Sequence, residues 1–324
     1  LGRYVDVEHT DVALDAYDAD GILDALALHV AQHAILATRA RQRGDKKAAA
    51  AAASGSDAEP PRDRGFTRPT VLVVLPLRSH ALAFVRALLD MLPSTTFEQV
   101  ENKARFIREY DADDGEISAS KPADFRALFA GNSDDCFRCA IRLTRKSAKL
   151  YAPFYKADVI VASPLGLRLA MGSAEDAKKT KYDADWLSSI ELLVAPYADI
   201  FSMQNVAHFT GAVGALNQLP AQTRDTDFSR VRACVLDGHA SALRQSVILS
   251  SQHTPEVRAM STRACANAAG RVIAQPACAD PALASPLARN ARQLFARFDA
   301  DDPTALADAR LRAFRTRVLP TLRR

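Results

Sequence analysis

Short runs of apolar residues recur along the chain, and segments long enough for a helix separate most of them. Runs that are rich in Val, Ile and Leu are typical of strands buried on both faces of a sheet. The expected strands cover residues 71–75, 97–101, 136–143, 159–162, 190–195, 246–249 and 271–274. Because they alternate with helical segments, the pattern predicts an α/β domain whose parallel sheet carries helices on both faces.

The ends of these strands are the places where a parallel sheet binds ligands. The sequence therefore predicts one shared edge for the turns that follow Leu75, Ala162, Ala195 and Leu249. In nucleotide-hydrolysing α/β domains, one such strand delivers acidic side chains to a magnesium–phosphate site. The corresponding turn is a degenerate acidic box in this chain, and its residues are Pro196, Tyr197, Ala198 and Asp199.

The pattern changes at both ends of the chain. Residues 20–43 carry apolar or small side chains at helical spacing and predict a helix. Residues 44–64 form an alanine-rich and then polar low-complexity linker, in which only the alanine part favours a helix. From Pro276 onward the pattern is helical and rich in arginine. The chain opens on Leu1 rather than Met, as expected of a fragment or an incomplete gene model.

Composition places the chain among ordinary globular proteins. Its 324 residues are 48% hydrophobic and 25% charged, enough for one large or two modest domains. No apolar run approaches the length of a membrane span, and no secretory signal is visible. The net charge of +4 is compatible with RNA binding but does not indicate it. Five cysteines, an odd and sparse set, favour free thiols in a reducing compartment.

Motifs for metal binding and catalysis are incomplete or missing. Cys136 and Cys139 form one C-x-x-C without a second pair, and His29 and His33 have no third ligand nearby. The chain contains no G-x-x-x-x-G-K-[ST], no G-x-S-x-G and no H-E-x-x-H, and no strand leads into G-x-G-x-x-G. The sequence therefore predicts no metal, no cofactor and no bond-making chemistry.

Several strand-end turns follow the motif order of the first RecA-like lobe of a DEAD-box RNA helicase. Residues 73–82 resemble the motif after the phosphate loop, and residues 158–168 resemble the next RNA-facing motif. Residues 195–199 stand in place of the acidic box, and residues 250–252 stand at the Ser-Ala-Thr position. This resemblance implies RNA contact at Arg78, Gly131, Ser163, Pro164 and Arg168. The alternative is that Gly131 and Pro164 only shape turns and that Arg78 caps a helix.

A basic stretch supplies two further RNA-binding candidates, Arg138 and Arg142. Both lie on one face if residues 136–143 form a strand, because side chains alternate along a strand. The alternative interpretation is a solvated charged surface.

Five segments taken together identify a narrower family. Residues 62–69, 131–138, 149–155, 198–205 and 227–232 resemble the U3 small nucleolar RNA-associated protein 25 family, also called digestive organ expansion factor. The resemblance covers about residues 20–324 and implies a nucleolar, helicase-like factor of the small-subunit processome that lacks a phosphate loop. The family usually has Asp-Gln-Ala-Asp at the acidic box, where this chain has Pro196 to Asp199. The resemblance also implies a second RecA-like lobe, which is expected to begin about where this sequence stops.

The resulting hypothesis is a catalytically inactive pseudo-helicase that serves ribosome biogenesis in the nucleolus. It implies an N-terminal helix and linker in residues 1–65, a RecA-like lobe in residues 66–275 and a helical connector in residues 276–324. The implied partners are U3 small nucleolar RNA, pre-rRNA and other processome proteins, with a role in 18S rRNA maturation and none at a membrane. One alternative is an RNA-dependent ATPase whose missing motifs lie outside the fragment. Another is a scaffold that contacts only proteins.

Overall fold

The computed structural model describes residues 1–10, 12, 17, 21–54, 59–93, 99–112, 115, 117–144, 146–172, 182–224, 226–274, 296–300, 302 and 305–322. Contacts divide the chain into two compact units, Leu1–Pro276 and Ala277–Arg324. In the second unit, α13 (Leu306–Ala313), a π-helical turn (Phe314–Val318) and α14 (Leu319–Leu322) follow one another. Among the described helices, none combines the length and the apolar character needed to cross a membrane.

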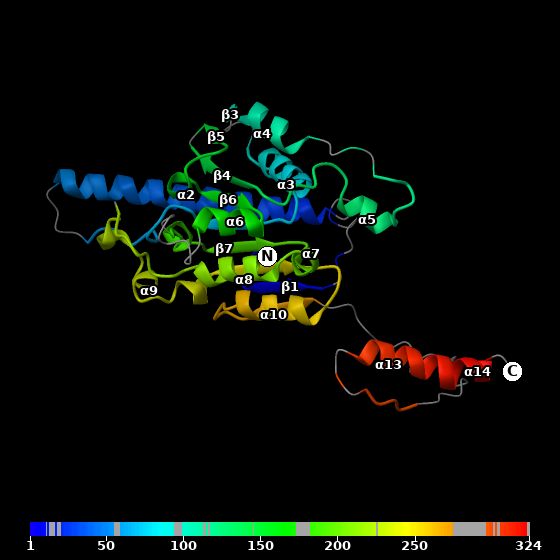
Figure 1. Ribbon diagram of the computed structural model, residues 1–324. Coiled ribbons are helices and arrows are strands. Elements are labelled where there is room, and N and C mark those ends of the chain that lie inside the picture. The colour runs from blue at the N-terminus through cyan, green and yellow to red at the C-terminus, as the bar shows by residue number, and fades with distance from the viewer. Residues whose placement is uncertain are drawn as a thin grey trace. The chain divides into compact units, whose positions relative to one another are not determined.

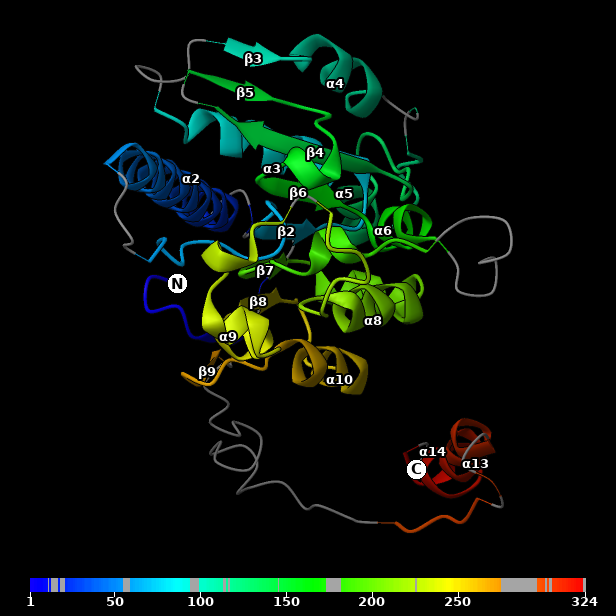
Figure 2. The same ribbon diagram turned by 90° about the vertical axis from the view of Figure 1, so that its left-hand side faces the viewer.

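A nine-stranded sheet forms the centre of the first unit (Figures 1 and 2). Its strand order is β3-β5-β4-β6-β2-β7-β8-β1-β9. The strands are β1 (Asp6–His9), β2 (Val71–Val74), β3 (Gln99–Glu101), β4 (Arg138–Leu143), β5 (Ser147–Lys149), β6 (Val159–Ala162), β7 (Leu192–Ala195), β8 (Gln245–Leu249) and β9 (Arg271–Ala274). Six neighbouring strands of the sheet, in the order β6-β2-β7-β8-β1-β9, run parallel to one another. The mixed α/β fold with a mostly parallel sheet is thus confirmed.

One side of the sheet departs from the expected parallel arrangement. Strand β4 pairs antiparallel with both β6 and β5, and β3 then pairs parallel with β5. A short connection explains the reversal, because β4 and β5 are separated by only a tight turn, whereas a parallel pair needs a long crossover. In that turn, the Thr144 hydroxyl donates to the Ser147 carbonyl over 2.9 Å.

Sequence patterning assigned no strand at β1 or at β5, and β1 is the longer of the two. The sequence interpretation assigned no strand before residue 71, because Asp6 and Glu8 interrupt any apolar run. Both side chains are nevertheless buried in the sheet. The Asp6 carboxylate accepts the backbone N–H groups of Ser246 and Asn267 over 2.6 and 2.8 Å, and Glu8 pairs with Arg271. Partners inside the fold therefore offset the cost of burying these charges.

Helices cover both faces of the sheet, and alternate residues of each strand face the two layers. One layer contains α2 (Ile22–Ser54) and α3 (Arg78–Asp90), which pack on Val71, Val73, Val159 and Val161. The other contains α6 (Pro164–Met171), α7 (Ala198–Met203), α8 (Val206–Ala215) and α10 (Pro255–Ala264). Figure 2 shows α2 on one face and α6, α8 and α10 on the other. The other described α-helices of the unit are α4 (Lys103–Tyr110), α5 (Ala123–Leu128) and α9 (Ala233–Leu236).

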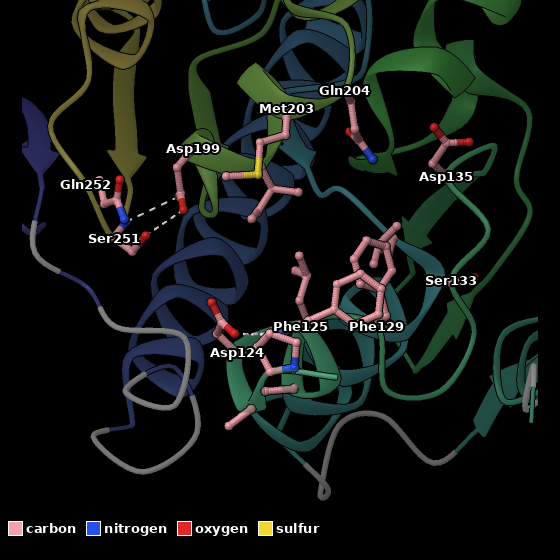
Figure 3. A pocket seen from close by; sticks show the side chains of 16 residues that line it. Asp124, Phe125, Phe129, Ser133, Asp135, Asp199, Met203, Gln204, Ser251 and Gln252 are labelled. Atoms are coloured by element: carbon pink, nitrogen blue, oxygen red, sulfur yellow. Dashed lines mark hydrogen bonds between the residues drawn. The ribbon is translucent and has the colours of Figure 1, made fainter. Parts of the chain in front are cut away.

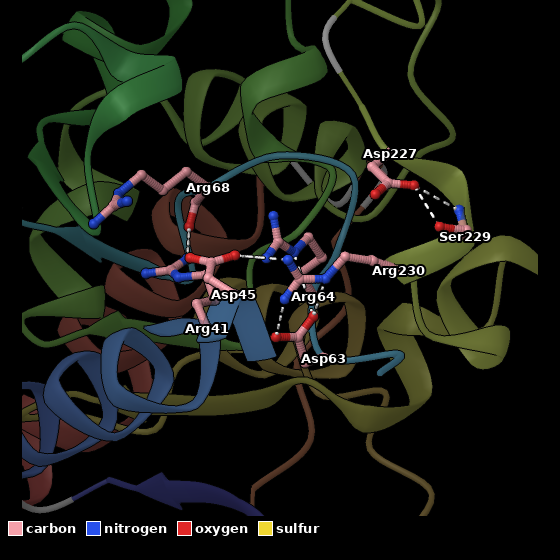
Figure 4. A network of polar contacts seen from close by, with 8 residues as sticks. All are labelled: Arg41, Asp45, Asp63, Arg64, Arg68, Asp227, Ser229 and Arg230. Atoms are coloured by element: carbon pink, nitrogen blue, oxygen red, sulfur yellow. Dashed lines mark hydrogen bonds and ion pairs between the residues drawn. The ribbon is translucent and has the colours of Figure 1, made fainter. Parts of the chain in front are cut away.

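Ion pairs join α2 to two distant segments at the amino-terminal edge of the sheet (Figure 4). Arg230 pairs with Asp45 and Asp63, each over 2.6 Å, and only 6% of Arg230 is exposed. Gly44 makes this approach possible, since an added Cβ there would overlap the Asp63 carboxylate. We call Asp45, Asp63, Arg64 and Arg230, together with Arg41, Arg68 and Asp158, the amino-edge network.

The amino-edge network accounts for two of the segments that resemble the family. Residues 62–69 supply Asp63, Arg64 and Arg68, while residues 227–232 supply Arg230. Asp227 accepts the Ser229 backbone N–H over 3.1 Å and caps the 3-10 turn Phe228–Arg230. In the structure, residues 227–232 therefore provide a cap and an internal ion pair.

Candidate functional site at the carboxyl edge of the sheet

Parallel pairing brings the carboxyl ends of five strands to one edge of the sheet. The registers align Val74 with Ala162, Ala195 with Ile248, and His9 with Leu249. The expected shared edge for the turns after β2, β6, β7 and β8 is therefore confirmed. The turn after β1 joins them at the same edge.

The segment from β1 to α2 has the order strand, connection, helix that phosphate-loop proteins use. Strand β1 lies between β8 and β9, in the interior of the parallel sheet. The connecting residues 10–21 read TDVALDAYDADG, with four aspartates, one terminal glycine and no lysine. Of these, the structure describes Thr10, Val12, Tyr17 and Gly21. Sequence reasoning missed this segment because β1 itself went unnoticed.

Two buried tyrosines stack where this segment meets the acidic-box position. The ring centroids of Tyr17 and Tyr197 are 3.9 Å apart, and the Tyr17 hydroxyl accepts the Tyr197 backbone N–H over 3.1 Å. The His80 ring lies 4.5 Å from that of Tyr197. We call these three side chains the aromatic stack. Tyr17 is 1% exposed and Tyr197 is 5% exposed, so both tyrosine rings are closed to solvent, whereas His80 is partly exposed.

The local environment of the aromatic stack is apolar and constrained. Burial lowers the pKa of His80 to about 4 and raises the pKa of the Tyr17 phenol. His80 is therefore neutral near pH 7. The backbone of Tyr197 has φ 60°, a left-handed conformation that bulky residues rarely adopt. Packing of its ring against two aromatic neighbours offsets that backbone cost.

Asp199, the one carboxylate left at the acidic-box position, is bound by the turn after β8. It accepts the Ser251 hydroxyl over 2.6 Å and the Ser251 backbone N–H over 3.2 Å (Figure 3). The structure thus joins Asp199 to residues 250–252, which the sequence matched to the Ser-Ala-Thr position. Asp199 is 6% exposed.

Among the RNA-binding candidates, Arg78 and Arg168 are engaged inside the protein. Arg78 pairs with Asp134 over 2.9 Å, donates to two backbone carbonyls and lies over the Tyr110 ring. Arg168 donates to the Gly172 carbonyl at the end of its own helix, over 2.7 Å. These internal acceptors compete with a phosphate for the N–H donors of both guanidinium groups.

Three further candidates shape the backbone at this edge. The buried Ser163 caps α6 by accepting the Gly166 N–H over 2.9 Å, and Pro164 occupies the first turn of that helix. Gly131 has φ 79°, a value that favours glycine. These are the structural roles that the alternative interpretation assigned to Pro164 and Gly131.

Arg138 and Arg142 lie on the same face of β4, as expected. Arg138 is exposed and aligns with Ala162, next to Ser163, at the carboxyl edge. Arg142 aligns with Lys149 of β5 near the other end of the strand. The structure therefore brings Arg138, Ser163 and Pro164 together and places Arg142 apart from them.

The histidines considered as metal ligands are hydrogen-bonded to other side chains, and Cys139 is buried. His29 bonds to Gln245 over 2.7 Å, and His33 bonds to Glu191 over 3.1 Å. Burial raises the pKa of the Cys139 thiol to about 12. In the described part of the chain, no group of three or more His, Cys, Asp or Glu residues could hold a metal ion.

An apolar pocket of about 1000 Å³ adjoins Asp199 and Ser251 at this edge (Figure 3). Helices α5 and α7 flank it, and its carbon-rich lining comes from Leu77, Phe125, Leu128, Phe129, Ile200 and Met203. Asp124, Asp135 and Asp199 are the charged residues in the described part of the lining. Sequence reasoning missed this pocket, because its walls come from segments that lie far apart in the chain.

This fold and its carboxyl edge define a domain of the NTP hydrolase-like class. A family model described as "UTP25, NTP hydrolase-like domain" matches residues 4–272. The chain belongs to the U3 small nucleolar RNA-associated protein 25 family.

Curated relatives support this membership. The chain is 43% identical to Protein NUCLEOLAR FACTOR 1 of Arabidopsis thaliana over 81% of its length and 36% of that protein's. It is 41% identical to U3 small nucleolar RNA-associated protein 25 of Podospora anserina, over 99% of its length and 47% of that protein's. The protein of the same name from Clavispora lusitaniae is 42% identical to this chain. That match covers 83% of this chain and 38% of the relative. The chain spans less than half the length of each of these relatives.

Proposed function

We propose that this chain is the non-catalytic NTP hydrolase-like part of a ribosome assembly factor. Its relatives are named for U3 small nucleolar RNA or for the nucleolus. The chain accordingly serves pre-rRNA processing and 18S rRNA maturation in the nucleolar small-subunit processome. Its partners are U3 small nucleolar RNA, pre-rRNA and other processome proteins. Residues 276–324 act as a connector towards a second lobe.

The aromatic stack is the observation that carries the non-catalytic assignment. A phosphate loop holds its ligand with backbone N–H groups and a lysine. Here Tyr17 comes from the equivalent connection and packs on Tyr197, and both rings are buried. The connection also contains four aspartates and no lysine, a charge distribution that repels phosphate.

The bonding of Asp199 supports the same conclusion. An acidic box holds Mg²⁺ together with the phosphates of the nucleotide. Asp199 instead uses both carboxylate oxygens to hold the turn after β8. A single carboxylate committed in this way is a poor magnesium ligand.

RNA contact is proposed first at Arg138 and Arg142, and secondarily at Arg78, Gly131, Ser163, Pro164 and Arg168. Most protein contacts to single-stranded RNA backbones use cations that reach phosphates from an open surface. Arg138 is exposed on β4, whereas Arg78 and Arg168 already donate to internal acceptors. The β4 arginines therefore carry the larger share of the expected affinity.

The test measures binding of ATP with Mg²⁺ and of a U3 or pre-rRNA fragment by the purified chain, the latter across a salt series. RNA binding that weakens with salt, without ATP binding, is expected. Arg138→Ala and Arg142→Ala should each lower the salt slope by about 1, because each removes one cation that binds a phosphate. Arg258→Ala, which removes an exposed arginine of α10, is the matched control and should bind as the parent does.

Other outcomes assign other functions. Magnesium-dependent ATP binding would overturn the proposal and favour an RNA-dependent ATPase. If the chain binds neither ATP nor RNA, it acts as a scaffold for proteins alone.

A further inference from the structure

The apolar pocket opens beside a site that the aromatic stack has closed. It shares Asp199 and Ser251 with that site and extends between α5 and α7. Its volume of about 1000 Å³ is at the upper end of the range for ligand pockets. The carboxyl edge thus retains a large concave surface although its phosphate position is filled.

Two large apolar side chains at this pocket are exposed to water. Met203, in the last turn of α7, is 75% exposed, and Phe125 of α5 is 39% exposed. Methionine is flexible and polarizable, and it is frequent at surfaces that accept helical peptides. Exposed carbon of this kind next to a carbon-lined pocket is typical of an interaction site.

The charged side chains in the described lining of the pocket are all negative. Among the residues that the structure describes, Asp124, Asp135 and Asp199 line it, and no lysine or arginine does so. Lys121 lies over the Phe125 ring, 5.4 Å from its centroid, but is not part of the lining. Such a lining repels the phosphates of RNA or nucleotides and attracts cationic groups.

We propose that the apolar pocket binds an amphipathic helix of a partner protein, whose apolar face carries a flanking lysine or arginine. The apolar side chains of this helix bury Met203, Phe125 and Leu128, while its cation faces Asp135. This inference rests on the proposed function, since it assigns to the inactive carboxyl edge the binding of an assembly partner in place of a nucleotide.

A synthetic peptide tests this assignment directly. The probe is a labelled helical peptide with leucines at positions i, i+3, i+4 and i+7 and lysines on its flanks; its partner probe has glutamates in place of the lysines. Anisotropy titration should detect binding of the lysine peptide and at least about tenfold weaker binding of the glutamate peptide. The net charge of +4 disfavours non-specific binding of the lysine peptide, which makes this order of affinity informative.

Matched variants locate the binding site. Met203→Lys should weaken binding of the lysine peptide about tenfold or more, because it adds a like charge and removes an apolar side chain from the interface. Leu169→Lys changes a 57% exposed leucine of α6, away from the pocket, and should leave binding unchanged. Asp135→Asn should reduce affinity several-fold and weaken its salt dependence.

Three results would overturn the assignment. They are equal binding of the two peptides, equal effects of Met203→Lys and Leu169→Lys, and a concentration-dependent dimer of the chain that Met203→Lys abolishes. The last result would make a second copy the occupant. The ATP measurement is independent of the peptide titration, so failure of this inference is distinguishable from failure of the proposed function.

Discussion

The two edges of the central sheet are stabilised by different forces. At the amino-terminal edge, ion pairs of Asp45 join α2 to residues 62–69 and to residues 227–232, and the buried Asp158 pairs with Arg41 of α2 and with Arg68. At the carboxyl-terminal edge, an aromatic stack closes one position and an apolar pocket remains open beside it. Satisfied buried charges specify one arrangement of the backbone, whereas an open apolar surface has no partner within the chain. The first edge therefore serves the architecture, and the second is the place to look for binding.

The largest expected effect comes from breaking the amino-edge network at Asp158. This carboxylate is fully buried, pairs with Arg41 and Arg68, and accepts the Leu143 N–H over 2.8 Å. Asp158→Ala leaves partly buried guanidinium groups without their anion and should cost about 3–5 kcal/mol of unfolding free energy. Urea denaturation measures the loss.

The control for Asp158→Ala is an exposed ion pair of the same chemistry. Asp111 pairs with Arg86 over 2.7 Å, and both side chains are about half exposed. Asp111→Ala should therefore cost about 0–1 kcal/mol. Similar losses for the two variants would contradict the structural role assigned to the amino-edge network.

The next largest effect concerns the carboxyl-terminal edge and depends on pH. The pKa of His80 is about 4 in the folded protein and 6.5 without burial. Between these values the unfolded chain binds more protons than the folded one, so stability falls as the pH falls through this window. The His80 contribution to this loss is about 3 kcal/mol in full.

Denaturation of His80→Leu at several pH values isolates that contribution. The variant should lose less stability than the parent between pH 6.5 and pH 4, because leucine takes up no proton. An unchanged slope in His80→Leu would mean that His80 is not held neutral by the aromatic stack.

Sequence patterning predicted the parallel centre of the sheet and its shared carboxyl edge, but not the residues that form the aromatic stack or line the apolar pocket. Runs such as residues 159–162 are apolar on both faces, so their burial is visible in the sequence. Strand β1 was hidden because Asp6 and Glu8 are buried against partners more than 200 residues away. The contact between Tyr17 and Tyr197 spans 180 residues, and no local pattern encodes it.

A smaller loss of stability is expected from a substitution at Gly44, where α2 approaches the Asp63 carboxylate closely. An added Cβ at Gly44 would overlap the Asp63 carboxylate and crowd Arg230, so Gly44→Ala should cost about 1–3 kcal/mol. Gly211 of α8 has open space around it, so Gly211→Ala should instead stabilise by about 0.5–1 kcal/mol. Thermal denaturation of both variants checks this difference in sign, which helix propensity alone would not produce.

The smallest change is Tyr17→Phe, which removes one hydroxyl from the aromatic stack and keeps its rings. The buried Tyr197 N–H would lose its acceptor, at a cost of about 1–2 kcal/mol in urea denaturation.

Tyr17→Ala extends the test by emptying the position of the ring. If the stack alone excluded nucleotide, Tyr17→Ala would gain ATP binding. We expect no gain, because residues 10–21 still lack a lysine and carry four aspartates. Isothermal titration with Mg-ATP separates a site that is merely blocked from one whose binding groups are gone.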